Sequence, residues 1–478
     1  MRFEKFLNDK TYEKMRLAYM FLFLFAVFTR VFMPIALLET QAINTAVFSF
    51  VAIFGAGTIL VDLFTSKVLF TAQNKVWLIL FLVIVFLSSA LNIKYGILGN
   101  IRNLVWLTIS FFVLYPADIN KSAQMLIKDL RLLSNTLIAL WFWGILYSLY
   151  MFLAQVGYYV YIPPDAFSRQ GFIENRLFGI FEDPNYAAMI SIIAIMFSFW
   201  NLKKFCQEKK SFKIFYCINI ILQIFYIALS GSRTAHLVLC GGAFVFSFFY
   251  LRQKHFKWRK NAALKEIIYL GLSALLSVSL FFAINLTAKG LSYAPIVFSN
   301  LHSQVKNSDE TKRLKPVELN REDLKDNSDI SSCRVKIWSS ALELFLSKPI
   351  FGTSPRNMRT YAKLEFPDNF IGKRGYAVHN IYLDVLTSTG ILGAVALLIF
   401  FIKYLIFVLK YLFAQDIEKK RHYLDVVFCV TIVVMIAASA MSLSEIFFVN
   451  TISVLFFWLL LGQSVYFIRK DKIPNLEK

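Results

Sequence analysis

The sequence predicts an all-α polytopic membrane protein with about twelve transmembrane helices and one large extracytoplasmic loop. Three observations support this fold class. Hydrophobic residues make up 58% of the 478 residues, and 50 residues are phenylalanine, which is more apolar surface than a soluble fold can bury. Apolar runs such as VWLILFLVIVFL at 76–87 recur along the chain. Lysine and arginine collect in alternate short loops between these runs.

Apolar runs of about 18 to 25 residues predict the transmembrane segments. We divide the chain into residues 1–288 with helices 1–9, an extracytoplasmic loop at 289–378, residues 379–468 with helices 10–12, and a cytoplasmic tail at 469–478. The first apolar run is too long for a cleavable signal peptide. The predicted segments lie at 16–38, 42–64, 76–93, 97–117, 132–160, 185–202, 213–230, 233–251, 266–288, 380–411, 424–443 and 446–468.

The net charge of +21 follows this topology. Basic residues concentrate in alternate loops, at 121–131, 203–210, 252–260 and 418–422, and at both termini, so the positive-inside rule places both termini in the cytoplasm. The positive charge therefore reflects the membrane topology and does not indicate nucleic-acid binding. Of the five cysteines only Cys333 falls in the outer loop, and no Cys-x-x-Cys spacing occurs, so we expect no disulfide within that loop and no metal.

Polar clusters outside the lysine-rich loops fall on the predicted outer side, at 161–189, 230–237 and 289–378. The charged stretch at 303–329 is expected to be flexible. An amphipathic helix is predicted near 334–347, and the SKPIFG sequence that follows is a helix stop. The predicted apolar stripe of this helix comprises Val335, Trp338, Ala341, Leu342 and Phe345.

Three predicted helices begin on the outer side with polar residues. Asp183 and Pro184 are typical of an N-cap and first residue for the sixth helix, Arg233 lies in the first turn of the eighth, and His379 opens the tenth. Helix N-termini attract anions, arginine binds phosphate through two hydrogen bonds, and histidine can act as a general base. The tenth helix is expected to place His379, Tyr382, Leu386 and Gly390 on one face.

Each of these residues also has a structural interpretation. Taken alone, Arg233 is more often an interfacial anchor, and Asp183 is more often a cap than a catalytic acid. His379 alone is equally consistent with an interfacial histidine. His236, Asp384 and Arg102 are weaker candidates, and Asp384 lies five residues from His379 and so points to another helix face.

The motifs taken together resemble the superfamily of O-antigen ligases and Wzy-type O-antigen and capsular polysaccharide polymerases. RTAHL at 233–237 fits an Arg-x-x-x-Leu motif, and HNIYLDVLTSTG at 379–390 fits a His-x10-Gly motif. FGIFEDPNYAA, SGSR and the R-x-x-IW…KPIFG string are also similar to this family and occur in the expected order. The resemblance covers about residues 170 to 465 and implies a GT-C-like helical layout.

The resemblance implies a metal-independent, inverting glycosyltransferase that uses undecaprenyl-diphosphate-linked glycan as donor and a second glycan as acceptor. Arg233 would hold the diphosphate, and His379 would position or deprotonate the acceptor hydroxyl. Gly390 and Gly393 would let the tenth helix pack closely. Further diphosphate or sugar contacts are expected from Arg176, Arg334, Asp183 and Asn185.

The family implies a site on the outer face of the bacterial cytoplasmic membrane, with a chain-length regulator membrane protein as a candidate partner. No residue separates a polymerase, which joins repeat units, from a ligase, which transfers the glycan to lipid A core. The motif sequence FEDPNYAA is more typical of a polymerase. A flippase for the same lipid is less consistent, because the segment centres carry almost no charge and the two halves do not resemble each other.

Overall fold

The computed structural model describes residues 9–36, 38, 40–117, 121–162, 166–205, 209–254, 262–306, 315–319, 333–414, 416–443 and 446–472. The chain folds into two compact units. Unit 1 comprises Met1–Val27, Gln41–Ile127 and Ser331–Lys478, and unit 2 comprises Phe28–Thr40 and Lys128–Ile330.

The predicted all-α membrane fold class is confirmed. Within the described residues, eight helices are long and apolar enough to cross a membrane, and three shorter apolar helices accompany them. Each predicted segment contains a helix. Most of the charged stretch at 303–329 lies outside the described residues.

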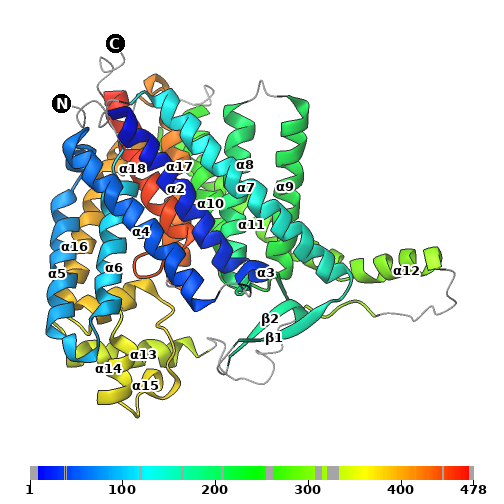
Figure 1. Cartoon of the computed structure of the whole chain (residues 1–478). Helices are drawn as coiled ribbons and strands as arrows, with labels where there is room; N and C mark the ends of the chain where they lie inside the picture. Colours follow the sequence, from blue (N-terminus) through cyan, green and yellow to red (C-terminus); the bar gives the residue numbers. More distant parts are fainter. Residues whose placement is uncertain are drawn as a thin grey trace. The chain divides into compact units, whose positions relative to one another are not determined.

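Unit 1 is built from both ends of the chain. Its helices α13, α14 and α15 gather at one end of α5, α6 and α16 (Figure 1). Its elements are α2 (Asp9–Val31, which ends in unit 2), α4 (Gln41–Phe64), η1 (Val68–Thr71), α5 (Lys75–Leu91), η2 (Ile93–Tyr95), α6 (Leu98–Ile109), the π-helical turn η3 (Ser110–Leu114), α13 (Arg334–Ser347), α14 (Met358–Glu365), α15 (Phe370–Arg374), α16 (Ile381–Leu412), η5 (Ile417–Lys419), α17 (Tyr423–Ser439) and α18 (Ile452–Lys472).

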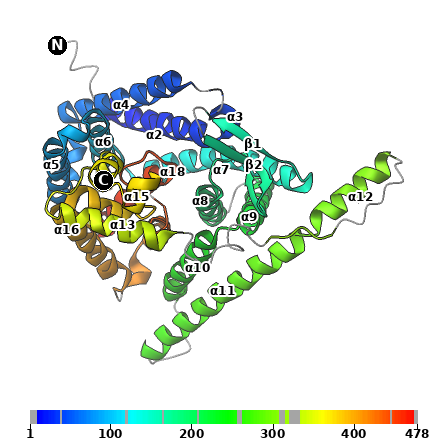
Figure 2. The ribbon, with the colours of Figure 1, turned by 90° about the horizontal axis from the view of Figure 1, so that it is seen from below.

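Unit 2 is a helical bundle with a small sheet at the end where α8 begins. Figure 2 views α8, α9 and α10 nearly along their axes. Its elements are α3 (Met33–Ala36), α7 (Ala123–Leu153, which starts in unit 1), β1 (Gly157–Ile162), β2 (Ala166–Ile173), β3 (Arg176–Gly179), α8 (Pro184–Lys204), α9 (Lys210–Leu229), α10 (Arg233–Lys254), α11 (Ala262–Leu291) and α12 (Ala294–Lys306).

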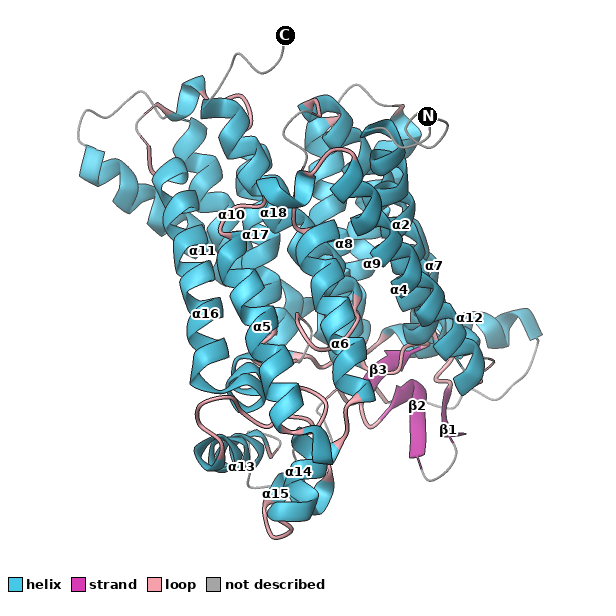
Figure 3. Ribbon diagram, turned by 60° about the vertical axis from the view of Figure 1, so that its left-hand side comes forward, coloured by secondary structure: helices cyan, strands magenta, loops and turns pink. Residues whose placement is uncertain are grey.

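The sheet was not predicted, and it makes the predicted end of the fifth segment wrong. Helix α7 stops at Leu153, and Gln155 takes a left-handed φ of 52° before β1 begins. β1, β2 and β3 pair in order as an antiparallel sheet (Figure 3). Glu174 and Asn175, with φ of 54° and 59°, form the turn between β2 and β3, as in a two-residue hairpin turn.

The start of the last predicted segment is also wrong. Helix α18 begins at Ile452, where the Thr451 hydroxyl accepts a hydrogen bond from the Val454 N–H at 3.1 Å. A threonine hydroxyl at this position caps the helix, so residues 446–450 precede it as irregular chain. The helix continues to Lys472.

Helix α16 is broken at Gly390, which has φ 65° and ψ −169°. The segment after α13 fills the break with backbone hydrogen bonds. The N–H of Thr353 donates to the Thr387 carbonyl at 2.9 Å, and the N–H of Ile391 donates to the Pro349 carbonyl at 2.8 Å. A Cβ on Gly390 would lie 2.2 Å from the Ile350 carbonyl oxygen, so only glycine fits. The predicted close packing at Gly390 is thus between helix and loop backbone.

Candidate active site

Three of the predicted site residues meet in unit 2 around the start of α8. Arg176, only 7% exposed, donates from Nε to the Ser230 carbonyl and from Nη2 to Asn185 Oδ1, both at 2.9 Å. Asp183 is the N-cap of α8, as predicted, and its Oδ1 accepts from the Asn185 N–H at 2.8 Å and from Asn185 Nδ2 at 3.0 Å. A buried guanidinium is therefore fixed where a helix presents its free N–H groups.

Arg233 opens α10, as predicted, and its side chain is exposed. The turn before it is tight, because Gly231 has a left-handed φ of 65° and the Ser232 hydroxyl accepts from the Ala235 N–H at 3.3 Å. The Ser230 carbonyl that holds Arg176 lies in this same turn. Unit 2 thus places two arginines next to the N-termini of α8 and α10, a combination suited to a diphosphate.

His379 and Arg334 fall in unit 1. His379 is exposed and has a left-handed φ of 50°. The preceding residue, Val378, is fully buried, and the following residue, Asn380, caps α16 by accepting from the N–H groups of Tyr382 and Leu383 at 3.0 and 3.3 Å. His379 is therefore held between two anchored neighbours.

The predicted helix face of His379, Tyr382, Leu386 and Gly390 is wrong. The helix starts at Ile381, two residues after the histidine, because the side chain of Asn380 provides the cap. Gly390 itself has non-helical dihedral angles.

Arg334 lies at the start of α13 and donates from Nη1 to the Ser442 hydroxyl at 3.3 Å. The N–H of Ile381 donates to the Ala440 carbonyl at 2.9 Å. Arg334 and the segment that carries His379 are thus both attached to the turn that follows α17.

The α13–α15 region has its own hydrophobic core. Helix α13 buries Ile337, Ala341 and Leu344, whereas Val335 and Leu342, from the predicted stripe, are 61% and 43% exposed. The predicted stripe is therefore right for Ala341 and for Trp338, which packs against this core, and wrong for Val335 and Leu342. Val378 belongs to this core, which connects the packing of the region directly to His379.

Lys348 fastens the segment that fills the α16 break. Its ammonium donates to Asn92 Oδ1 and lies 4.6 and 5.0 Å from the ring centroids of Tyr361 and Tyr95. Asn92 in turn donates to the Gly352 carbonyl at 2.9 Å. Burial lowers the pKa of Lys348, and the positive charge of Lys94 adds to this effect, whereas the carboxylate of Glu365 opposes it.

Of the three weaker candidates, His236 and Asp384 have partners within the fold, and Arg102 is exposed. The His236 Nε2 lies 3.1 Å from the Ile227 carbonyl and so ties α10 to α9. Asp384 accepts from the Ser388 hydroxyl at 3.2 Å, and Arg102 is exposed on α6.

Unit 1 contains an apolar cavity of about 520 Å³ between α16 and α17. It extends from Tyr382, three residues after His379, to Leu405, and Phe457 of α18 contributes to its lining. Apart from Tyr382 and Tyr404, all residues that line the cavity are aliphatic or phenylalanine. The cavity therefore suits a hydrocarbon chain.

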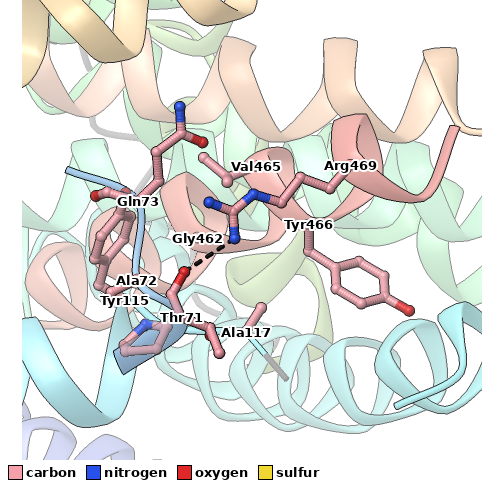
Figure 4. Close-up of a pocket in the computed structure, with 10 residues that line it drawn as sticks. Thr71, Ala72, Gln73, Tyr115, Ala117, Gly462, Val465, Tyr466 and Arg469 are labelled. Atoms are coloured by element: carbon pink, nitrogen blue, oxygen red, sulfur yellow. Dashed lines mark hydrogen bonds between the residues drawn. The ribbon is translucent and has the colours of Figure 1, made fainter. Parts of the chain in front are cut away.

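A second cavity in unit 1, of about 10 Å³, has room for only about one water molecule. Arg469 donates there to the Thr71 carbonyl at 2.9 Å (Figure 4). It is too small for a sugar. Within the described ranges, no group of three or more histidine, cysteine or acidic residues could hold a metal ion.

Residues 218–398 match the O-antigen ligase family, Wzy_C. The predicted resemblance is confirmed over these residues, which include Arg233, Arg334 and His379 but not the group around Arg176. The match indicates an integral membrane enzyme that processes glycans. A search of curated proteins found no match.

Sequence reasoning missed two residues that position the site. Asn380 was readable as an N-cap, since asparagine directly precedes an apolar helix. Ser230 acts through its backbone carbonyl, and no side-chain pattern identifies such a role.

Proposed function

We propose that the protein is a membrane glycosyltransferase that polymerises undecaprenyl-diphosphate-linked oligosaccharide repeat units into surface polysaccharide, on the outer face of the cytoplasmic membrane. The observation that carries this proposal is the setting of His379. It is exposed between a buried residue and a helix cap, inside the segment that matches a glycan-processing family.

The reaction is a single displacement at the anomeric carbon of the donor. The acceptor hydroxyl forms the new C–O bond while His379 takes its proton, and the bond from the anomeric carbon to the diphosphate oxygen breaks. The electron pair leaves with the lipid diphosphate, so one step inverts the anomeric configuration. No metal takes part in this scheme.

Arg233 stabilises the charge that develops on the departing diphosphate. Arg176 supplies a second guanidinium, with Asn185 and Asp183 fixing its direction, and Arg334 assists the sugar or the diphosphate.

A ligase is the second candidate, because the matching family is described as O-antigen ligase. In that case the same chemistry transfers the finished glycan to a sugar of lipid A core. The acceptor alone distinguishes the two reactions.

The test uses the purified protein in nanodiscs with lipid-diphosphate-linked repeat units from the host, and a gel that resolves glycan length. A ladder formed from these units alone supports the polymerase, whereas products that require lipid A core identify a ligase. Arg233→Ala should abolish either product, while Arg374→Ala, which removes an exposed arginine elsewhere, should not. Lipid movement across the bilayer without glycan transfer contradicts both reactions.

A further inference from the structure

The three-stranded sheet of unit 2 exposes aromatic side chains on one face. Tyr159 pairs with Arg169, and Tyr161 pairs with Phe167, so these four side chains alternate onto the same side of β1 and β2. Tyr159, Tyr161 and Phe167 are 57%, 52% and 67% exposed. We call these three residues, together with the Arg169–Glu174 pair, the aromatic face.

The opposite side of the sheet is anchored. Ser168 and Gln170, which alternate with Phe167 and Arg169 along β2, are 5% and 2% exposed. The Gln170 amide also donates to the Ser168 hydroxyl at 3.2 Å. Strand β2 is therefore supported from below, although Tyr158 of β1, which pairs with Gln170 on that opposite side, is 49% exposed. Exposed aromatic groups on a supported strand indicate a binding site.

Polar groups are fixed among the rings. Arg169 Nε donates to Glu174 Oε1 at 2.8 Å, and the Tyr159 hydroxyl donates to the same oxygen at 3.3 Å. The left-handed turn at Glu174 and Asn175 returns this carboxylate toward β1. Flat rings beside a planar guanidinium and a carboxylate fit a saccharide, whose C–H faces stack on rings and whose hydroxyls accept and donate hydrogen bonds.

The aromatic face adjoins the arginine that holds the diphosphate in the proposed reaction. The guanidinium carbons of Arg169 and Arg176 lie 5.7 and 5.6 Å from the centroid of the Phe178 ring. One ring thus contacts both the open face and the buried Arg176. A sugar attached to a diphosphate at Arg176 would begin next to this face.

We propose that the aromatic face binds the saccharide part of the lipid-linked substrate and so keeps the glycan beside Arg176. This inference rests on the proposed function. Insertion of the face into the bilayer is disfavoured, because the Arg169–Glu174 ion pair would lose its water.

The experiment measures binding without catalysis. The probe is lipid-free oligosaccharide, obtained by mild acid cleavage of the surface polysaccharide of the host, and binding to the full-length protein in nanodiscs is followed by saturation-transfer NMR. The double variant Tyr159→Ala/Phe167→Ala should bind about tenfold more weakly or worse. Tyr159→Phe should bind normally, because the ring remains.

Tyr293→Ala is the matched control, since this tyrosine of unit 2 is also 57% exposed but lies outside the sheet. Unchanged binding by a correctly folded double variant overturns the inference. The inference is also overturned if brominated lipids quench the fluorescence that a Phe167→Trp variant gains over the wild type, which would place the face in the bilayer. A changed oligomeric state of the double variant overturns it as well. Binding that depends on the face, without transfer of lipid-linked glycan, would contradict the proposed function alone.

Discussion

At His379 the backbone has a left-handed φ of 50°, a conformation that histidine adopts more readily than most residues but that still costs about 1 to 3 kcal/mol. Val378, buried in the α13–α15 core, and Asn380, the cap of α16, hold it there. The imidazole is thereby exposed at a fixed place, as a general base requires. The sequence predicted His379 as a site residue, but it placed this residue inside the helix, which in the structure begins only at Ile381.

Asn380→Ala should lower the free energy of unfolding by about 1 kcal/mol, because two N–H groups lose their acceptor. It should also slow glycan transfer, since His379 would lose one of its anchors. Thermal unfolding in detergent and the transfer assay measure the two effects. Asn380→Ser, which keeps a capping oxygen, should largely restore both, and equal losses in the serine and alanine variants would contradict this role.

Arg176→Lys should weaken binding of the lipid-linked donor roughly tenfold to hundredfold. A lysine cannot donate to the Ser230 carbonyl and to Asn185 at once while facing a diphosphate. The KM for the lipid-linked donor reports this loss. Arg102→Lys, at an exposed arginine, is the control, and an unchanged KM in Arg176→Lys would remove Arg176 from the site.

At the scale of elements, hydrophobic runs were enough to locate the helices, because apolar length is a direct signal of a membrane segment. The sheet and the break in α16 were not visible in those runs. The apolar run continues past Gln155 and Gly157 to Ile162, so it hides the end of α7, and Gly390 has apolar and helix-compatible neighbours. Both features depend on hydrogen bonds between segments that are distant in the sequence, such as the bond from the Ile391 N–H to the Pro349 carbonyl.

Gly390→Ala should destabilise the protein by at least about 1 to 3 kcal/mol, because it combines a left-handed φ with a Cβ 2.2 Å from a backbone oxygen. The unfolding temperature is the measurement. Gly271→Ala, in α11 with open space around its Cβ, should be neutral or slightly stabilising. Similar effects of the two substitutions would contradict the inserted segment.

The contact between η2 and the end of α14 predicts a pH dependence. Hydrogen bonds from Tyr95 and Lys94 lower the pKa of Glu365. The folded chain therefore favours the carboxylate, and this contribution is present above the unfolded pKa of about 4.3 and is lost as the pH falls through the lower folded value. Glu365→Gln should slightly lower the unfolding temperature at neutral pH and have no effect below about pH 3. An equal effect at both pH values would contradict the assignment.

At the scale of the whole molecule, unit 1 joins the two ends of the chain through contacts that no local pattern reveals. Arg16 donates to the Val113 and Leu114 carbonyls, and Tyr466 donates to the Lys121 carbonyl. The motifs nevertheless identified Arg233, Arg334 and His379 in a segment that matches a glycan-processing family. The family resemblance could therefore be predicted more readily than the assembly of the unit, because motifs are local in the sequence and the contacts that build the unit are not.

The most direct test of the account is the single-turnover rate of glycan transfer from the lipid-linked donor, compared between wild type, His379→Ala and Tyr376→Ala. Tyr376 is 43% exposed in the same segment and serves as the control. We predict that His379→Ala transfers about 10²- to 10⁴-fold more slowly while its fold is intact, and that Tyr376→Ala transfers normally. Transfer by a folded His379→Ala variant at the wild-type rate would contradict the central claim.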